Sequence, residues 1–298
     1  LQSYQTILSL LISLLIWLFY LINLSLFKKK KFPNYFIKTY FLNCFLKSSF
    51  LRNINYFFIF KNFFKKNKHK NIYYLFENIS WEKSLNLCGI KSKLLPYQHT
   101  SVRDWDFRYH LFNFEEKFLK PFVPSFVFAN SKYNQSKLIK NLCNVKVYKK
   151  KSTRYSLPKK KLSKIENKSI LILGDIDNTE TNKMIELLKL NSNFNLHLKT
   201  HPAADYDLSF NNVKLAKGEI NELLPKYNRI LCSNSTTSVF EVIVSKRKPF
   251  VYWDSNQINL CPLKDFKGIN FVTSEKDLTK FNNINNDINH YKFIKKFF

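Results

Sequence analysis

Glycine is scarce in this sequence: its 298 residues include only Gly89, Gly174, Gly218 and Gly268. Dinucleotide-binding loops of the G-x-G-x-x-G type and P-loops need several glycines within a few positions. The four glycines lie far apart, so the sequence disfavours a nicotinamide-dependent dehydrogenase and a P-loop kinase. A Gly-x-Ser-x-Gly elbow is also missing, which disfavours an α/β-hydrolase.

Paired cysteines are missing as well. The five cysteines have no short paired spacing, which argues for reduced thiols in a cytosolic setting and against a zinc site or a disulfide framework. They are Cys44, Cys88, Cys143, Cys232 and Cys261.

Acidic residues are few: 21 Asp and Glu face 49 Lys and Arg, a formal net charge of +28. Such a charge suggests nucleic acid, anionic lipid or a phosphorylated substrate as a partner. Lys, Asn, Ile and Phe are abundant throughout, however, as in a protein encoded by AT-rich DNA, so most of the charge reads as dispersed and solvated. No zinc-finger, RNP or arginine-rich signature is present, and we expect no nucleic-acid partner.

An almost unbroken apolar run extends from Ile7 to Phe27 and is followed by four lysines. It is long enough to span a bilayer as a helix, and the lysines would hold its carboxyl end on the cytoplasmic side. If a folded part of the first domain precedes Leu1, however, a spanning helix would leave that part on the wrong side of the membrane, and the segment would then lie in the membrane surface or be buried in the protein. We expect residues 1–31 to be a membrane-associated segment at the cytoplasmic face of the inner membrane, peripheral or anchored by one helix. The aromatic and basic region 32–70 suits a membrane interface or a helix packed on the domain.

A strand and helix alternation follows, with each strand ending in a polar cluster, which predicts a parallel sheet. In residues 32–150 we expect a first domain. The sequence begins at Leu1 without a methionine, so we expect this domain to be incomplete at its amino end. Its expected strands are 72–76, 93–97, 126–129 and 145–148, with helices beginning near Trp81 and Lys132.

Residues 151–168 are basic, contain Pro158 and lack periodicity, which is typical of a linker. Residues 169–298 repeat the alternation as a second α/β domain. We expect Thr179 to cap its first helix. Its expected strands are 169–173, one ending at His201, 213–216, 229–232 and 249–253, and its expected helices are 179–190, 219–227 and one carrying Phe240.

Two strand ends of this second domain predict an anion site. The strand before His201-Pro202 must stop there because proline disfavours continuation, so the turn presents the imidazole, whose N–H can donate to a phosphate. After the strand 229–232, five hydroxyl side chains occur within Ser233 to Ser238, at the start of a helix that carries Glu241. Hydroxyls and backbone N–H groups at a helix start favour an anion. Together they predict a phosphate or diphosphate pocket built without glycine.

Three carboxylate pairs have the form Asp-x-Asp and can hold a divalent ion: Asp104 with Asp106, Asp175 with Asp177, and Asp205 with Asp207. Turn chemistry produces such pairs often. We therefore expect no metal site and no cofactor.

Several of these strings resemble one family. The strand ending in His201-Pro202, the string Ser233 to Thr237 followed by Phe240-Glu241, and the strand 248–252 are similar to the nucleotide-binding domain of a GT-B glycosyltransferase. The strings Glu77-Asn78-Ile79-Ser80-Trp81-Glu82 and 98–109 look like blocks of bacterial surface carbohydrate biosynthesis proteins. More distantly, the chain resembles capsule polymerases and sialyltransferases that use a His-Pro motif. The family has more glycine near its strand ends.

The resemblance implies two facing Rossmann-like domains that transfer a sugar, without metal, from a nucleotide-sugar donor to a surface glycan or lipid-linked acceptor at the cytoplasmic membrane. It implies that Glu77, His99 and Asp104 act in catalysis, with Glu77 and His99 as alternative bases. It further implies a set of donor-binding residues: Arg103, His201, Pro202, Ser235, Thr236, Thr237 and Glu241. Two alternatives stay open, a polyol-phosphate transferase of similar fold and a membrane-tethered polyanion-binding protein without catalysis.

Overall fold

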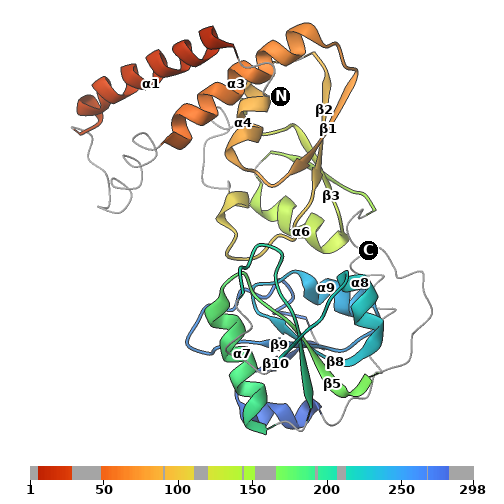
Figure 1. Ribbon diagram of the computed structural model, residues 1–298. Coiled ribbons are helices and arrows are strands. Elements are labelled where there is room, and N and C mark those ends of the chain that lie inside the picture. Colours follow the sequence, from red (N-terminus) through yellow and green to blue (C-terminus); the bar gives the residue numbers. More distant parts are fainter. Residues whose placement is uncertain are drawn as a thin grey trace. The chain divides into compact units, whose positions relative to one another are not determined.

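The structure is a computed structural model (Figure 1). It describes residues 6–28, 48–89, 91–110, 120–142, 144–151, 166–191, 194–206, 213–266 and 268–281. The undescribed residues include most of the expected linker, the last three residues of the expected membrane-associated segment, the stretch 32–47 of the aromatic and basic region with Cys44, Cys143, and the carboxyl-terminal tail. The chain divides into two compact units. Unit 1 comprises residues 1–99, 108–129 and 137–148, and unit 2 comprises residues 100–107, 130–136 and 149–298.

Unit 1 contains a four-stranded sheet of order β1-β2-β3-β4. Strands β1 and β2 are parallel, as are β2 and β3. The expected strands and helices of this region are confirmed to within a few residues. The strands are β1 (Asn71–Phe76), β2 (Lys93–Gln98), β3 (Phe126–Ala129) and β4 (Lys146–Lys149), and α4 (Ser80–Leu87) is a helix of this unit. Helix α6 (Lys132–Asn141) begins in unit 2 and ends in unit 1.

Two further helices precede the sheet of unit 1. The apolar run forms α1 (Ile7–Lys28), and the aromatic and basic region forms α3 (Ser48–Lys66). Helix α3 packs on α4, where Phe60 contacts Trp81 and the Ser84 hydroxyl donates to the Asn53 carbonyl at 2.9 Å. Within the part of the chain that the structure describes, no helix has the length and apolar character needed to cross a membrane.

Unit 2 is built on a six-stranded sheet of order β10-β9-β8-β5-β6-β7, in which every neighbouring pair is parallel. The second half of β5, from Ile170 to Leu173, is buried and reads as a continuous apolar run, as is typical of strands covered on both faces in parallel sheets. The strands are β5 (Glu166–Leu173), β6 (Asn195–Lys199), β7 (Lys214–Leu215), β8 (Tyr227–Ser233), β9 (Pro249–Tyr252) and β10 (Asn270–Val272).

Two apolar clusters hold the two faces of this sheet. Leu171 and Leu173 of β5 belong to the cluster that includes α9 (Ser238–Val244), whereas Ile170 and Ile172 belong to the one that includes α7 (Asn178–Asn191). The short helix α8 (Ile220–Leu223) continues into a 3-10 helix at Leu224–Lys226. A parallel sheet with helices on both faces confirms the α/β, Rossmann-like fold class.

One local prediction is wrong. Helix α7 begins at Asn178, and its cap is Asp177, whose carboxylate accepts the backbone N–H of Thr179 at 2.8 Å. Thr179 is therefore the residue that is capped. Both residue types are good caps, so the sequence alone does not decide whether Asp177 or Thr179 caps the helix.

Candidate functional site

The carboxyl ends of the unit 2 strands share one edge because all the strands are parallel. Strand β5 is followed along the chain by β6 and β7 on one side, and β8 returns to pair with β5 on the other side. The strand order therefore reverses between β5 and β8. In open parallel sheets, ligands bind in the crevice at the carboxyl ends of the strands at such a switch point. Asp175, which follows β5, and Ser235, which follows β8, stand there.

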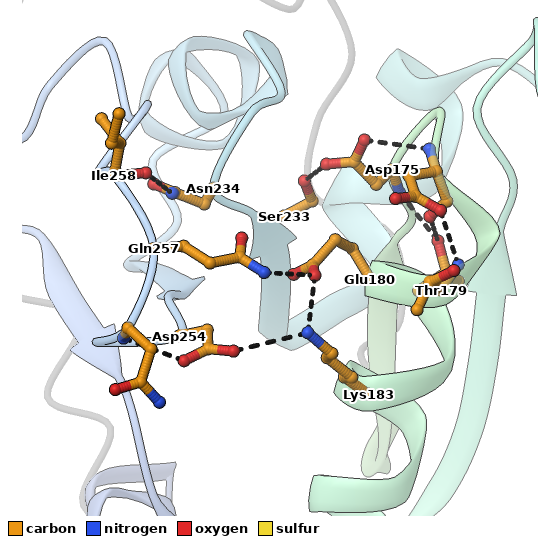
Figure 2. Close-up of polar contacts among 12 residues, drawn as sticks. Asp175, Thr179, Glu180, Lys183, Ser233, Asn234, Asp254, Gln257 and Ile258 are labelled. Atoms are coloured by element: carbon orange, nitrogen blue, oxygen red, sulfur yellow. Dashed lines mark hydrogen bonds and ion pairs between the residues drawn. The ribbon is translucent and has the colours of Figure 1, made fainter.

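Asp175 joins the two strand ends. Its Oδ2 accepts hydrogen bonds from the hydroxyls of both Ser233 and Ser235, the latter at 2.5 Å. Its backbone N–H donates to Thr181 Oγ1 at 3.0 Å, and its Oδ1 accepts the backbone N–H of Asp177 at 3.1 Å. Figure 2 shows the carboxylate between Ser233 and the start of α7. Asp175 thus ties the carboxyl end of β8 to the residues that follow β5 at the switch point.

The charge of Asp175 is held by these donors. Burial on its own would raise the pKa of the carboxyl, but hydrogen bonds from Ser233, Ser235 and backbone N–H groups outweigh it and hold the pKa below its usual value. The Ser233 and Ser235 hydroxyls both donate their hydrogen atoms to this carboxylate. Ser235 therefore offers an approaching ligand the lone pairs of its hydroxyl oxygen, while its hydroxyl proton stays with Asp175 and its backbone N–H donates to Ser233 Oγ at 3.2 Å.

Arg103 lies at the same strand end. Its Nη2 donates to the backbone carbonyl of Ser235, which puts a guanidinium beside the hydroxyl run within unit 2. Its neighbour Asp104 forms an ion pair with Lys264, with 3.0 Å between Oδ2 and Nζ. The structure thus brings together Arg103 and Ser235, two residues to which the family resemblance gives a role in donor binding, and it gives Asp104 a cationic partner.

His201 follows β6, the other neighbour of β5. The backbone N–H of Ala203 donates to His201 Nδ1 at 3.1 Å, and Ala204 N–H donates to the His201 carbonyl at 3.0 Å, which closes the turn at Pro202. Because Nδ1 is an acceptor, the neutral ring carries its proton on Nε2. This turn leaves Nε2–H as the donor for a ligand.

Thr236, Thr237 and Glu241 occupy the start of α9. The Thr236 hydroxyl donates to Ser238 Oγ at 3.1 Å and accepts the Ser238 backbone N–H at 3.2 Å. Thr237 precedes the helix and makes no side-chain cap hydrogen bond, and Glu241 lies in the first turn, half-buried. The predicted helix after the hydroxyl run is confirmed.

A second polar network at this edge was missed by the sequence analysis (Figure 2). Lys183 of α7 pairs with Glu180 at 2.9 Å and with Asp254, which follows β9, at 3.4 Å. Gln257 Nε2 donates to Glu180 Oε1 at 2.9 Å. The only sequence signal was that Asp254 ends a strand, because the other partners lie on a helix and a loop without any motif. The network ties α7 to the loop after β9.

In unit 1, Glu77 and His99 directly follow β1 and β2. These strands are paired in register from Asn71 with Lys93 to Phe76 with Gln98, so the two candidate bases stand next to each other at one sheet edge. Glu77 forms an ion pair with Arg108, at 3.5 Å between Oε2 and Nη1.

Glu82, the last residue of the Glu-Asn-x-x-Trp-Glu string, holds the loop that carries Glu77. Its carboxylate accepts the backbone N–H groups of Glu77 at 2.9 Å, Asn78 at 3.1 Å and Ile79 at 3.4 Å. Asn78 has a φ of +55°, in the left-handed region, and its side-chain amide donates to the Arg108 carbonyl. Burial raises the pKa of Glu82 to about 7 even though these N–H groups favour the charged form.

The Asp-x-Asp pairs make hydrogen bonds and ion pairs in the structure. Asp175 receives the serine hydroxyls, Asp177 caps α7 and Asp104 pairs with Lys264. Among the described residues, no three His, Cys, Asp or Glu side chains gather as a metal site would need. Asp207 lies outside those residues.

No protein-family model and no curated protein matches the sequence. Solved structures similar to the chain include the glycosyltransferase of kitacinnamycin, at 8% identity and a TM-score of 0.48, with 76% of this chain and 71% of that chain covered. Another is MurG of Acinetobacter baumannii, at 12% identity and a TM-score of 0.44, covering 80% and 68%. CalG4, the calicheamicin glycosyltransferase, is similar at 8% identity and a TM-score of 0.46, covering 78% and 72%. TM-scores at this level carry no functional argument, so function is argued from the residues, and the His-Pro resemblance stays a prediction.

Proposed function

We propose that the chain is a glycosyltransferase whose nucleotide-sugar donor binds at the carboxyl edge of the unit 2 sheet. The observation that carries the proposal is the set of polar groups at the switch point, where Asp175, Ser235 and Arg103 are joined by hydrogen bonds. His201 stands at the end of the adjacent strand β6. Hydroxyl acceptors, a carboxylate, a guanidinium and an imidazole N–H together suit a ligand that has both phosphates and sugar hydroxyls.

The donor's diphosphate needs cationic and N–H groups that stabilise the charge developing as it leaves. Our candidates are His201 Nε2–H, the Arg103 guanidinium and the backbone N–H of Thr237. The backbone N–H of Thr236 is a further candidate, although it donates to the Ser233 carbonyl at 3.4 Å and would have to exchange that long hydrogen bond for the ligand. Glu241 is the candidate for the ribose hydroxyls, which a carboxylate accepts as hydrogen-bond donors.

The acceptor hydroxyl must lose its proton as it attacks the anomeric carbon, while the bond to the diphosphate breaks and its electrons leave with the nucleotide. Glu77 and His99 are the alternative bases. We expect Glu77→Gln or His99→Asn, whichever replaces the base, to lower kcat by about 10²-fold or more with little change in donor affinity. If both variants keep the wild-type kcat, neither residue is the base.

The proposal extends to an acceptor that is a surface glycan or a lipid-linked sugar of cell-surface polysaccharide synthesis, used without a metal ion at the cytoplasmic membrane face. Resemblance of the strings around Glu77 and His99 to surface carbohydrate proteins supports this part. The aromatic and basic residues before β1 support a membrane location, since such residues suit an interface.

The decisive experiment is calorimetric binding of UDP, GDP, CMP, CDP and dTDP to the full chain. We expect selective binding of one nucleotide, lost in His201→Ala and retained in His69→Ala, which replaces an exposed histidine of unit 1. A folded protein that binds none of the five, yet binds a polyanion, overturns the transferase in favour of a polyanion-binding protein. Binding of a cytidine nucleotide together with release of a polyol phosphate from its activated donor indicates the polyol-phosphate transferase.

A further inference from the structure

Helix α1 turns its apolar side chains outward. Leu8 and Leu15 are each 65% exposed, Phe19 is 62% exposed and Ile22 is 75% exposed. These residues and Leu11 are spaced by three and four positions, so they form one continuous stripe along the helix. A helix on the surface of a water-soluble protein normally shows the opposite arrangement.

The inward face of α1 carries small polar residues. Ser9 and Ser13 are buried, one turn apart, on the side opposite to the exposed stripe. Figure 1 shows α1 beside α3, and the Tyr20 and Phe50 rings meet edge to face at 5.5 Å. Small residues between helices and large apolar residues outside are the pattern of helices in lipid, where close backbone approach drives the packing.

Three polar side chains of α1 donate to backbone carbonyls one turn earlier in the chain. Ser9 Oγ donates to the Thr6 carbonyl and Ser13 Oγ to the Ser9 carbonyl, both at 2.7 Å. Asn23 Nδ2 donates to the Phe19 carbonyl at 2.8 Å. Since a polar group in hydrocarbon must find its partner inside the protein, these bonds remove a large cost of placing α1 in lipid.

The charge of the residues around α1 favours an anionic lipid surface over a second copy of the chain as the partner of this stripe. The sequence contains no Asp or Glu before Glu77, while Lys and Arg recur from Lys28 to Lys70. Lys61, Lys65 and Lys68, at and just after the end of α3, are exposed. A second copy of the chain would bring a second acid-free basic region against the first, and the two would repel. Anionic headgroups would attract it.

We propose that the exposed stripe of α1, made of Leu8, Leu11, Leu15, Phe19 and Ile22, binds the surface of an anionic lipid bilayer. The stripe enters the headgroup and acyl boundary, and the exposed lysines Lys61, Lys65 and Lys68 attract the anionic headgroups. This names the surface that would serve the membrane location in the proposed function, and it holds or fails independently of glycosyl transfer.

The test is flotation of the full chain with vesicles of phosphatidylcholine, with and without phosphatidylglycerol. Leu8→Gln with Leu15→Gln alters the stripe and keeps good helix formers. The matched control is Ile139→Gln with Leu190→Gln, two similarly exposed apolar residues on helices α6 and α7. We expect the wild type and the control to float with the anionic vesicles, and the α1 variant to bind at least about tenfold more weakly.

Three results overturn the proposal: a folded wild type that floats with neither vesicle, an α1 variant that binds as tightly as the wild type, or a control that loses binding equally. Circular dichroism of each variant establishes that it is folded. Sedimentation without lipid tests whether a second copy of the chain binds the stripe instead. If the wild type self-associates and the α1 variant does not, the stripe is a contact between two copies and the proposal fails. Nucleotide binding measured on the same variants separates failure of this proposal from failure of the transferase.

Discussion

At the scale of single residues, Asp175 is the side chain on which the switch point of unit 2 depends. Asn at this position keeps the shape but offers an NH2 group where Oδ2 accepts two hydroxyls. We expect Asp175→Asn to lower the free energy of unfolding by about 1–3 kcal/mol, because buried donors lose a charged acceptor. Nucleotide affinity should fall with it. Denaturant unfolding and calorimetry measure the two effects.

Asp177→Asn is the matched control for that substitution, since Asn caps a helix as well as Asp does. It should change the free energy of unfolding by less than about 0.5 kcal/mol. Equal stability of Asp175→Asn and the wild type would show that the serine hydroxyls do not depend on the carboxylate.

Glu82 gives a pH dependence at the same scale. Its folded-state pKa, about 7, lies above its ordinary value, so between about pH 4.5 and 7 the folded state binds more protons than the unfolded state. The contribution of Glu82 to stability is thus present at low pH and is lost as the pH rises through 7. The ionisable residues Glu77, Tyr74 and Lys83 lie around this carboxyl, and Arg108 pairs with Glu77.

Glu82→Gln has no titrating group, so we expect the Tm of the wild type relative to Glu82→Gln to be higher at pH 5 than at pH 8, by about 3 °C or more. The neighbouring ionisable groups are common to both proteins, and their titration largely cancels in this difference. A difference in Tm that is the same at both pH values would place the titration of Glu82 outside this interval.

At the scale of elements, Gly174 sets how closely β5 and α7 approach. A Cβ at this position would lie 3.2 Å from Thr181 Oγ1 and 3.3 Å from Thr181 Cγ2. Thr181 Oγ1 is also the acceptor of the Asp175 N–H, so it has little freedom to move. We expect Gly174→Ala to destabilise the protein by about 1–3 kcal/mol in denaturant unfolding.

Thr181→Ser removes the methyl group and keeps the hydroxyl, so it supplies the matched second variant. The double variant should be more stable than the sum of the two single effects implies, because the clash with Cγ2 is gone. Strict additivity would locate the cost of Gly174→Ala elsewhere in the strand.

At the scale of the whole molecule, the net charge of +28 should make lipid binding sensitive to salt. Raising the salt concentration from about 0.1 M to about 1 M shortens the Debye length from about 10 Å to about 3 Å. We expect the preference for anionic over neutral vesicles to shrink over this range, while a residual, salt-independent binding through α1 persists. Flotation at both salt concentrations measures this. A preference for anionic vesicles that is unchanged by salt would argue against the basic residues.

The sequence by itself determined the alternation of strands and helices, the strand that stops at His201-Pro202 and the helix after the hydroxyl run. These features follow from local rules, namely apolar periodicity, proline geometry and capping, which act within a few residues. These rules could not decide whether Asp177 or Thr179 caps α7, since both residues suit the position.

Only the tertiary structure decided which distant residues meet. Pairing of β8 with β5 brings Ser235 to Asp175, which lies sixty positions earlier, and the loop after β2 brings Arg103 to the same strand end. The use of Glu82 as the acceptor for three N–H groups depends on the left-handed turn at Asn78. Similarly, the apolar run predicts a helix, but it does not predict which face of the helix is buried. In the structure Ser9 and Ser13 are buried, and the large apolar side chains on the opposite face are exposed. Strand order and packing arise from long-range contacts, which no local pattern encodes.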